Sequence, residues 1–160
     1  MVLKGGYVPP PPPTPTPVYI PKPKPISTSK WITPSDSVCK ANGGRIDEYG
    51  ICEANWKNAK KICRASGGTL PSKEVLGEVV TDCGGLLNDW ESKKMKKNGN
   101  NSNYQSCYKN KGFSDFYSYW SSTSISSSND YAWIVYVYSG AQYSYDKVNS
   151  VYVRCVRAGE

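Results

Sequence analysis

The chain has 160 residues, which is enough for one domain with a hydrophobic core and an appended segment. Apolar residues make up 38% of it, and no run approaches the roughly 18 apolar residues of a membrane-spanning helix, so membrane insertion is not expected. The formal net charge of +7 suits polyanionic partners, although an excess of lysine is also typical of an ordinary soluble surface.

Cysteine and histidine usage limits the chemistry further. The six cysteines include no C-x-x-C pair, which predicts disulfides rather than a zinc site. Disulfides form in oxidising compartments, so an extracellular or cell-surface location is expected. Because the chain has no histidine, it lacks the usual general base and the Ser–His and Cys–His triads. We therefore expect no catalytic residues, no metal and no cofactor, and a protein that is not an enzyme.

Residues 1–30 form a separate proline-rich segment. Eleven of the twelve prolines lie in the first 34 positions, including the run from Pro9 to Pro13. Proline fixes φ and lacks a backbone N–H, so this segment is predicted to be an extended linker or tail in the polyproline II conformation. We interpret it as a spacer, with a ligand for an aromatic-lined groove as the alternative. The globular domain is expected over residues 31–160.

A turn region and a first helix are predicted at the start of the globular part. Residues 39–52 begin and end with a cysteine, Cys39 and Cys52. The turn signal N-G-G between them predicts a short closed hairpin. Asn55 is expected to cap a helix that runs to about Ser66, because apolar residues recur there at helical spacing and two glycines follow.

A second helix and a polar segment follow. Ser72 is expected to cap this helix, whose valines and leucine make one apolar stripe that ends at Gly84-Gly85. From Asn88 to about Gly112 the chain is polar and is predicted to be a long loop region.

The strongest β signal lies in residues 119–157. Within it, one set of residues alternates with another, so that one set can face a core and the other solvent. The first set is Trp133, Val135 and Val137, and the second is Ile134, Tyr136 and Tyr138. Ser139-Gly140 is a turn signal, and residues 151–157 are predicted to form a second β-rich run.

The residues expected to face outward are rich in tyrosine and serine. They are Tyr136, Tyr138, Ser139, Tyr143, Ser144, Tyr145 and Ser150. Tyrosine gives a large amphipathic contact with few rotors and serine gives adaptable hydrogen bonds, so this composition is typical of binding loops. The alternative is an ordinary sheet, since aromatic residues favour strands in any case.

The order of these segments resembles a known fold. A helix, L-P-S, a second helix, polar loops, Y-W-S-S-T, A-W-x-V and Y-V-R-C-V-R together resemble a bacterial branch of the C-type lectin-like fold. The resemblance covers roughly residues 37–157. It implies an α+β domain in which two helices pack on short antiparallel strands.

The resemblance also implies how the cysteines pair. In that fold the first helix is bridged to the last strand, which implies Cys63–Cys155. A second bridge in the loop region would be Cys83–Cys107, and a bridge in the N-terminal hairpin would be Cys39–Cys52. The sequence alone permits many other pairings.

Two functional branches of the fold lack their motifs here. Calcium-dependent sugar lectins use E-P-N or Q-P-D followed by W-N-D, and none of these strings occurs in the chain. Asn88-Asp89 comes too early for such a motif and is expected to form a turn or cap. Formylglycine-generating enzymes need a reactive cysteine pair near the C-terminus, where this chain has Cys155 alone.

The third branch comprises the variable proteins of diversity-generating retroelements, whose C-terminal region is rewritten at template adenines, mainly in asparagine codons. A template resembling N-x-A-W-N-V-N-F-N-N-G…N-N-Y-V-R would give the pattern seen here, since each proposed position carries a residue reachable from an AAC codon by changing only its adenines, although the same residue types are common on surfaces. The changeable, ligand-binding positions would be Ile134, Tyr136, Tyr138, Ser139, Ala141, Tyr143, Ser144, Tyr145, Asp146, Val148, Asn149 and Ser150, with Val151 changeable as well.

The remaining residues of this region would form a fixed framework. It would comprise Trp133, Gly140, Lys147, Tyr152, Arg154 and Arg157. Gln142 is not reachable from AAC and must also be framework if the interpretation holds. Trp120 and Trp133 are expected in the core, and Arg154 and Arg157 are expected to make structural contacts.

The sequence therefore predicts a non-enzymatic surface recognition protein with a protein or glycan ligand on another cell or particle. The alternative is a fixed adhesin that binds sulfated or anionic glycans through lysines, which are Lys93, Lys94, Lys96, Lys97, Lys109 and Lys111. Nucleic acid is disfavoured, because no reader motif is present and disulfides indicate a location outside the cytosol. A homotrimer would suit a displayed head, although no heptad or collagen repeat is present to enforce one.

Overall fold

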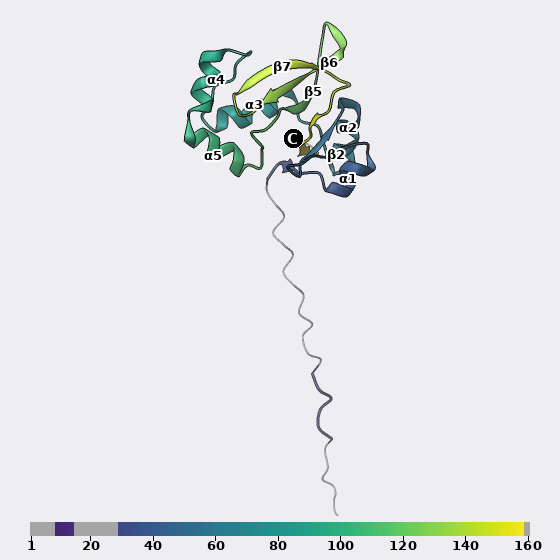
Figure 1. The fold of residues 1–160 in the computed structure, drawn as a ribbon. Helices are drawn as coiled ribbons and strands as arrows, with labels where there is room; N and C mark the ends of the chain where they lie inside the picture. The colour runs from purple at the N-terminus through teal and green to yellow at the C-terminus, as the bar shows by residue number, and fades with distance from the viewer. Residues whose placement is uncertain (1–8, 15–28, 159–160) are drawn as a thin grey trace, which may run out of the picture.

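The computed structural model describes residues 9–14 and 29–158. Residues 9–14 are exposed and have no regular secondary structure, and residues 29–158 form a mixed α+β domain (Figure 1). The rest of the predicted proline-rich segment, residues 1–8 and 15–28, lies outside the described residues. Ser29 and Lys30 already contact the domain, because their backbone carbonyls accept hydrogen bonds from Arg157. Within the described residues, no helix has both the length and the apolar character needed to cross a membrane.

Two sheets organise the described part of the domain. The smaller sheet has the strand order β1 (Trp31–Ile32), β9 (Cys155–Arg157), β4 (Gly68–Thr69). The larger sheet has the order β2 (Arg45–Ile46), β3 (Cys52–Ala54), β8 (Val151–Tyr152), β5 (Tyr119–Ile125), β6 (Ser128–Tyr136), β7 (Ala141–Asp146). The predicted β run at residues 151–157 is confirmed, but it is divided between the two sheets. Strands β5 and β8 pair in parallel, and the other named pairs are antiparallel.

The two predicted helices are confirmed as α2 (Trp56–Ala65) and α3 (Lys73–Asp82). The side chains of Asn55 and Ser72 each accept a hydrogen bond from the backbone N–H three residues further on. This contact satisfies one of the N–H groups that a helix leaves without an internal partner. Both helices therefore begin where their capping residues predict.

The prediction of a long loop at residues 88–112 is wrong. This segment contains α4 (Ser92–Gly99) and α5 (Ser102–Asn110), so the described residues include five helices rather than the two expected. Tyr104 and Tyr108 lie one turn apart on α5 and are fully buried. The buried stripe of α5 consists of tyrosines among polar residues. The sequence of this segment therefore shows only a weak helical periodicity of hydrophobic residues.

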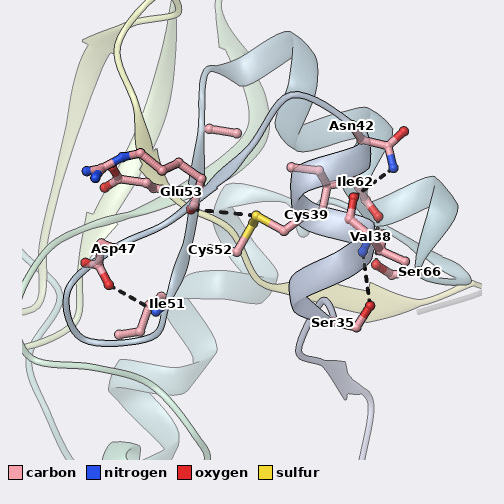
Figure 2. The surroundings of a disulfide bond; sticks show 12 residues. Ser35, Val38, Cys39, Asn42, Asp47, Ile51, Cys52, Glu53, Ile62 and Ser66 are labelled. Carbon is pink, nitrogen blue, oxygen red and sulfur yellow. Dashed lines mark hydrogen bonds and ion pairs between the residues drawn. A yellow bond between two sulfur atoms is a disulfide. The ribbon is translucent and has the colours of Figure 1, made fainter.

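The expected hairpin at residues 39–52 is partly wrong. Cys39 belongs to a further short helix, α1 (Asp36–Ala41), and the hairpin is formed by β2 and β3 alone. Figure 2 shows the disulfide that joins Cys39 on α1 to Cys52 on β3. The carboxylate of Asp47 accepts the N–H groups of Tyr49 and Ile51 and so closes the turn between the two strands.

All six cysteines form disulfides, and the three pairs are those that the resemblance implies. They are Cys39–Cys52, Cys63–Cys155 and Cys83–Cys107. The second pair joins α2 to the last strand across 92 positions of the sequence, and the third joins the end of α3 to α5. Figure 1 shows α3, α4 and α5 grouped at the left of the domain, with α1 and α2 at its right.

Hydrophobic residues are buried on both faces of β6. Val135 and Val137 belong to one core cluster, together with residues of α3 and α5, whereas Ile134 belongs to a second cluster that includes residues of α2. The predicted alternation is therefore present. The expectation that the second set faces solvent is wrong for Ile134, whose exposed fraction is 1%. A strand with helices near both faces buries residues of both sets.

Two tryptophans and two arginines complete the framework. Trp120 is fully buried, as predicted, but Trp133 is only half-buried, and the Nζ atom of Lys73 lies 3.6 Å from its ring centroid. Arg154 donates to the carbonyl of Lys111, and Arg157 makes the contact with Ser29 described above. The structural contacts expected of both arginines are confirmed.

Candidate ligand-binding pocket

The register of β6 and β7 brings several of the predicted binding residues to one face of the sheet. Ile134 lies opposite Tyr143, and Tyr136 lies opposite Ala141. Tyr145 is two residues from Tyr143 and shares its face. These residues form the side of the sheet that faces away from α3.

The other predicted strand residues lie on the opposite face. Ser144 pairs with Trp133, and Asp146 pairs with Tyr131, so both project toward the α3 side. The single Tyr/Ser surface expected from the sequence is therefore wrong in this respect. Because neighbouring residues of a strand point to opposite sides, a run of polar aromatic positions cannot all reach one ligand.

The face with Ile134 and Tyr143 carries a pocket of about 450 Å³. Its walls combine strands, loops and segments that are far apart in the sequence. They are Glu53, Trp90, Phe116, Tyr117, Ser118, Ile134, Tyr136, Tyr143, Tyr145, Ser150, Val151 and Tyr152. Five of the predicted binding residues line it, namely Ile134, Tyr136, Tyr143, Tyr145 and Ser150.

The remaining predicted binding residues lie elsewhere. Tyr138 is exposed near α5, where its carbonyl accepts the side-chain amide of Gln105. Val148 and Asn149 belong to the turn after β7, and Val148 is 76% exposed. Ser139 and Ala141 are buried, so their expected place on a binding surface is wrong.

Two buried asparagines hold the turn between β6 and β7 in place. The side-chain amides of Asn88 and Asn98 both donate to the carbonyl of Ser139, at 3.0 and 2.8 Å. Both also donate to the carbonyl of Leu86, and the Asn98 oxygen accepts the Leu86 N–H. The turn is thus tied to the loop at residues 86–91. Asparagine is common in turns, so the sequence offered no signal for this buried role.

Trp90 occupies an unusual backbone conformation at the edge of the pocket. Its φ of 68° makes it the only non-glycine residue with positive φ in the part of the chain that the structure describes. Such a conformation costs about 1–2 kcal/mol for a residue other than glycine. The Asn88 side chain accepts the Glu91 N–H, and the Asn88 backbone bonds to Gly140 and Gln142, which fixes both ends of this segment. Strained residues of this kind concentrate at functional sites.

The pocket rings meet at steep angles. Trp90 and Tyr143 have ring centroids 4.9 Å apart and an interplanar angle of 72°. Tyr143 and Tyr145 meet at 79°, and Tyr117 and Tyr152 meet at 77°. Edge-to-face pairs of this kind are favourable contacts of aromatic rings. Neighbouring rings of the pocket wall are therefore steeply inclined to one another, so their faces point in different directions.

Of the seven hydroxyl groups in the pocket lining, four are hydrogen-bonded within the protein, namely those of Ser118, Tyr136, Tyr143 and Tyr152. The Tyr143 hydroxyl lies 2.9 Å from that of Ser118, and the Tyr136 hydroxyl donates to the carbonyl of Asp115 at 3.1 Å. The Tyr152 hydroxyl donates to the Asp47 carboxylate at 2.5 Å. Burial raises the pKa of both Tyr136 and Tyr143, so these hydroxyls stay uncharged at neutral pH.

Glu53 supplies the charged group of the pocket lining. Its carboxylate pairs with Arg45, whose Nε donates at 2.9 Å and whose side chain is 72% exposed. A second carboxylate, that of Asp47, lies behind the lining and holds the Tyr152 hydroxyl. Burial acts to raise the pKa of Asp47, but the hydrogen bonds from Tyr152, Ile51 and Tyr49 outweigh it, and the pKa falls below its ordinary 3.8.

The pocket thus offers aromatic surface, hydroxyl groups and one carboxylate. All six cysteines of the chain are in disulfides, and the chain contains no histidine. Among the described residues, no three His, Cys, Asp or Glu side chains gather in a way that could hold a metal ion. The aromatic faces, hydroxyl groups and carboxylate that are present can contact a ligand through stacking, hydrogen bonds and charge.

Five of the six lysines of the alternative prediction lie on α4 and α5, and Lys111 directly follows α5. Lys93, Lys96 and Lys97 are exposed on α4, whereas Lys94 pairs with Glu91 at 3.2 Å. Lys109 on α5 pairs with Asp115. The predicted lysine loop is therefore a helical surface, separate from the pocket lining.

Comparison of the chain with models of protein families and with curated protein sequences finds no match.

Proposed function

We propose that this protein is a non-enzymatic recognition protein whose ligand-binding head has a C-type lectin-like fold and acts outside the cytosol, at the cell surface. The observation that carries the proposal is the aromatic pocket, because residues predicted to bind a ligand from the sequence line it together. Three disulfides support an oxidising location. The bridge from α2 to the last strand is the one expected for this fold.

The proposal includes diversification of the pocket by a retroelement. Tyr136, Tyr143 and Tyr145 are changeable positions that line the pocket, and the framework residue Tyr152 lines it with them. A disulfide-linked framework keeps the backbone fixed while such side chains change, so little binding energy is lost in ordering the site. The burial of Ser139 and Ala141 limits what those two positions can accept, since larger residues there would overpack the core.

Sequencing the last third of the gene across a clonal population and its near relatives tests this proposal. We expect variation at the codons for Tyr136, Tyr143, Tyr145 and Ser150, with less at Ser139 and Ala141 than their codons permit. The codons for Trp120 and Tyr152 should be invariant and serve as internal controls. A 3′ end without variation would refute diversification.

A second function, that of a fixed adhesin for sulfated glycans, is favoured by one observation. Lys93, Lys96 and Lys97 are exposed on α4, and none has a carboxylate partner within ion-pair distance among the described residues. Replacement of these lysines by glutamine should abolish salt-sensitive retention on heparin. Replacement of three exposed lysines on α1 and α2, Lys40, Lys57 and Lys61, removes the same charge and is the matched control. Equal effects of the two sets would count against a specific surface on α4.

A further inference from the structure

We infer that the aromatic pocket binds a ligand through a quaternary ammonium group. This inference rests on the proposed function of ligand recognition and names the chemical class of the ligand. It follows from the arrangement of the rings, from the charges around them, and from the hydrogen bonds already made within the pocket.

The ring geometry suits a cation without a preferred direction. Trp90, Tyr143 and Tyr145 form two consecutive corners of 72° and 79°, and Tyr117 and Tyr152 form a third of 77°. Each aromatic face carries negative electrostatic potential, so rings set at steep angles can direct several faces at one guest. A roughly spherical trimethylammonium group can contact such faces at once.

The lysine and arginine side chains that lie over aromatic rings do so outside the pocket lining. Lys60 and Lys147 lie over Trp56, at 3.8 and 4.1 Å from the ring centroid, and Lys73 lies over Trp133. Further lysine and arginine contacts are made with Trp31 and Phe113. Within the described residues, no lysine or arginine lies over a ring of the pocket lining. The faces of the pocket rings are therefore not covered by a cation of the described residues.

The charges beside the pocket favour the same class of ligand. Glu53 belongs to the lining and Asp47 lies behind Tyr152, whereas Arg45 is the cation paired with Glu53. The lining itself contains neither lysine nor arginine. Two carboxylates against one exposed arginine leave a local excess of negative charge, which attracts a cation over a distance of several ångströms.

The hydrogen bonds already made within the pocket favour a quaternary ammonium over a primary ammonium. Glu53 accepts both Arg45 hydrogen bonds through Oε1, which leaves its second oxygen as an acceptor, and the hydroxyls of Tyr136 and Tyr152 donate to the Asp115 carbonyl and the Asp47 carboxylate. A primary ammonium needs acceptors for three N–H donors, and burial without them is costly. A quaternary ammonium has no donor to satisfy, so its transfer into this pocket leaves no hydrogen bond unmade.

Some residues of the pocket lining are not among the positions proposed to change. Trp90, Tyr117, Tyr152 and Glu53 are not among the changeable residues, and Trp90 is held in its strained conformation by the loop at residues 86–91. Affinity for quaternary ammonium would therefore persist among variants, while Tyr143 and Tyr145 adjust its strength.

The test uses the full chain labelled for NMR, with choline as the probe and 3,3-dimethyl-1-butanol as the control. The two molecules have nearly the same shape and differ by the positive charge. We expect choline to shift the indole N–H resonance of Trp90 and to bind at least about tenfold more tightly than the neutral alcohol. Equal affinities, or no shift with choline at the highest soluble concentrations, would overturn the inference.

Two tyrosines of similar exposure provide matched variants. Tyr145 is 39% exposed and lines the pocket, whereas Tyr131 is 41% exposed and lies on the opposite face of the sheet. Tyr145→Leu should weaken choline binding by about threefold to tenfold, and Tyr131→Leu should leave it unchanged. An equal loss in both variants would assign the effect to a general change of the protein and overturn the inference.

A third measurement distinguishes the possible sources of the quaternary ammonium group. Binding to choline and also to phosphatidylcholine vesicles, but not to phosphatidylglycerol vesicles, would assign the site to a lipid headgroup. Binding to choline alone would assign it to a small free cation or an exposed substituent. If neither probe binds while the gene varies at the expected codons, the recognition function stands and only the ligand class is refuted.

Discussion

At the scale of single residues, Trp90 shows how the backbone and the pocket depend on each other. The loop at residues 86–91 is tied to the β6–β7 turn by Asn88 and Asn98, and these contacts determine the path of the chain at Trp90. The strain at this residue is therefore maintained by interactions elsewhere in the loop. Its side chain remains 57% exposed, and its ring packs edge to face against Tyr143.

Two truncations of Trp90 measure this strain. Trp90→Gly should be more stable than Trp90→Ala by about 1 kcal/mol in urea unfolding, because the steric cost of about 1–2 kcal/mol that alanine has at positive φ exceeds the roughly 0.4–1 kcal/mol that glycine costs through the unfolded chain. Tyr117, another exposed pocket residue but without positive φ, is the control. There the alanine variant should be the more stable by about 0.4–1 kcal/mol. The same order at both positions would show that the Trp90 backbone is not strained.

Asp47 links the stability of the hairpin to pH. Its pKa in the folded protein is lowered below 3.8, so its contribution to stability is complete above that value and is lost as the pH falls through the lower folded pKa. Asp47→Asn should therefore reduce the free energy of unfolding at neutral pH, and the difference from wild type should shrink below pH 3.8. Urea unfolding across this range provides the measurement. Asp89→Asn, at an exposed carboxylate, is the control, and a difference for Asp47→Asn that does not change with pH would contradict the expectation.

At the scale of elements, helices with strong local signals were predictable and helices that depend on packing were not. Asn55 and Ser72 mark the starts of α2 and α3, because capping is a local interaction between a side chain and the next turn. In α5 the buried stripe consists of Tyr104 and Tyr108 within polar surroundings, which does not distinguish a helix from a loop. Burial of these rings against residues of α3 and β6 stabilises a segment whose own pattern is weak.

The strands show the same division. The alternation in β6 follows from backbone geometry and is visible in the sequence. Which of its faces contacts water depends on the elements that cover it. Ile134 is buried because α2 and neighbouring strands contribute residues to the cluster on its side. The sequence of β6 itself does not show which elements pack against this face.

At the scale of the whole molecule, the disulfides tie distant segments together. Cys63–Cys155 closes a loop with a sequence separation of 92, whereas Cys39–Cys52 closes one of 13. In the chain-entropy model the longer loop contributes about 4–5 kcal/mol and the shorter one about 3 kcal/mol.

Serine replacement of each pair tests this difference. The double variant Cys63→Ser/Cys155→Ser should lose more stability in urea unfolding than Cys39→Ser/Cys52→Ser, by about 1–2 kcal/mol. The shorter bridge serves as the control, since both variants remove two buried sulfurs. A larger loss for the shorter bridge would indicate that local packing, rather than chain entropy, dominates.

The sequence by itself determined the features that arise from neighbouring residues, which are the capped helices, the strand alternation, and a tyrosine- and serine-rich C-terminal region. It also indicated the α+β class, and the resemblance supplied the cysteine pairs. Only the tertiary structure decided which tyrosines share a pocket. That pocket joins Glu53, Trp90, residues 116–118 and strands β6 and β7, and such long-range neighbours are specified by how the sheet and loops pack together. For the same reason the burial of Ser139 and the strained conformation of Trp90 were not evident from the sequence.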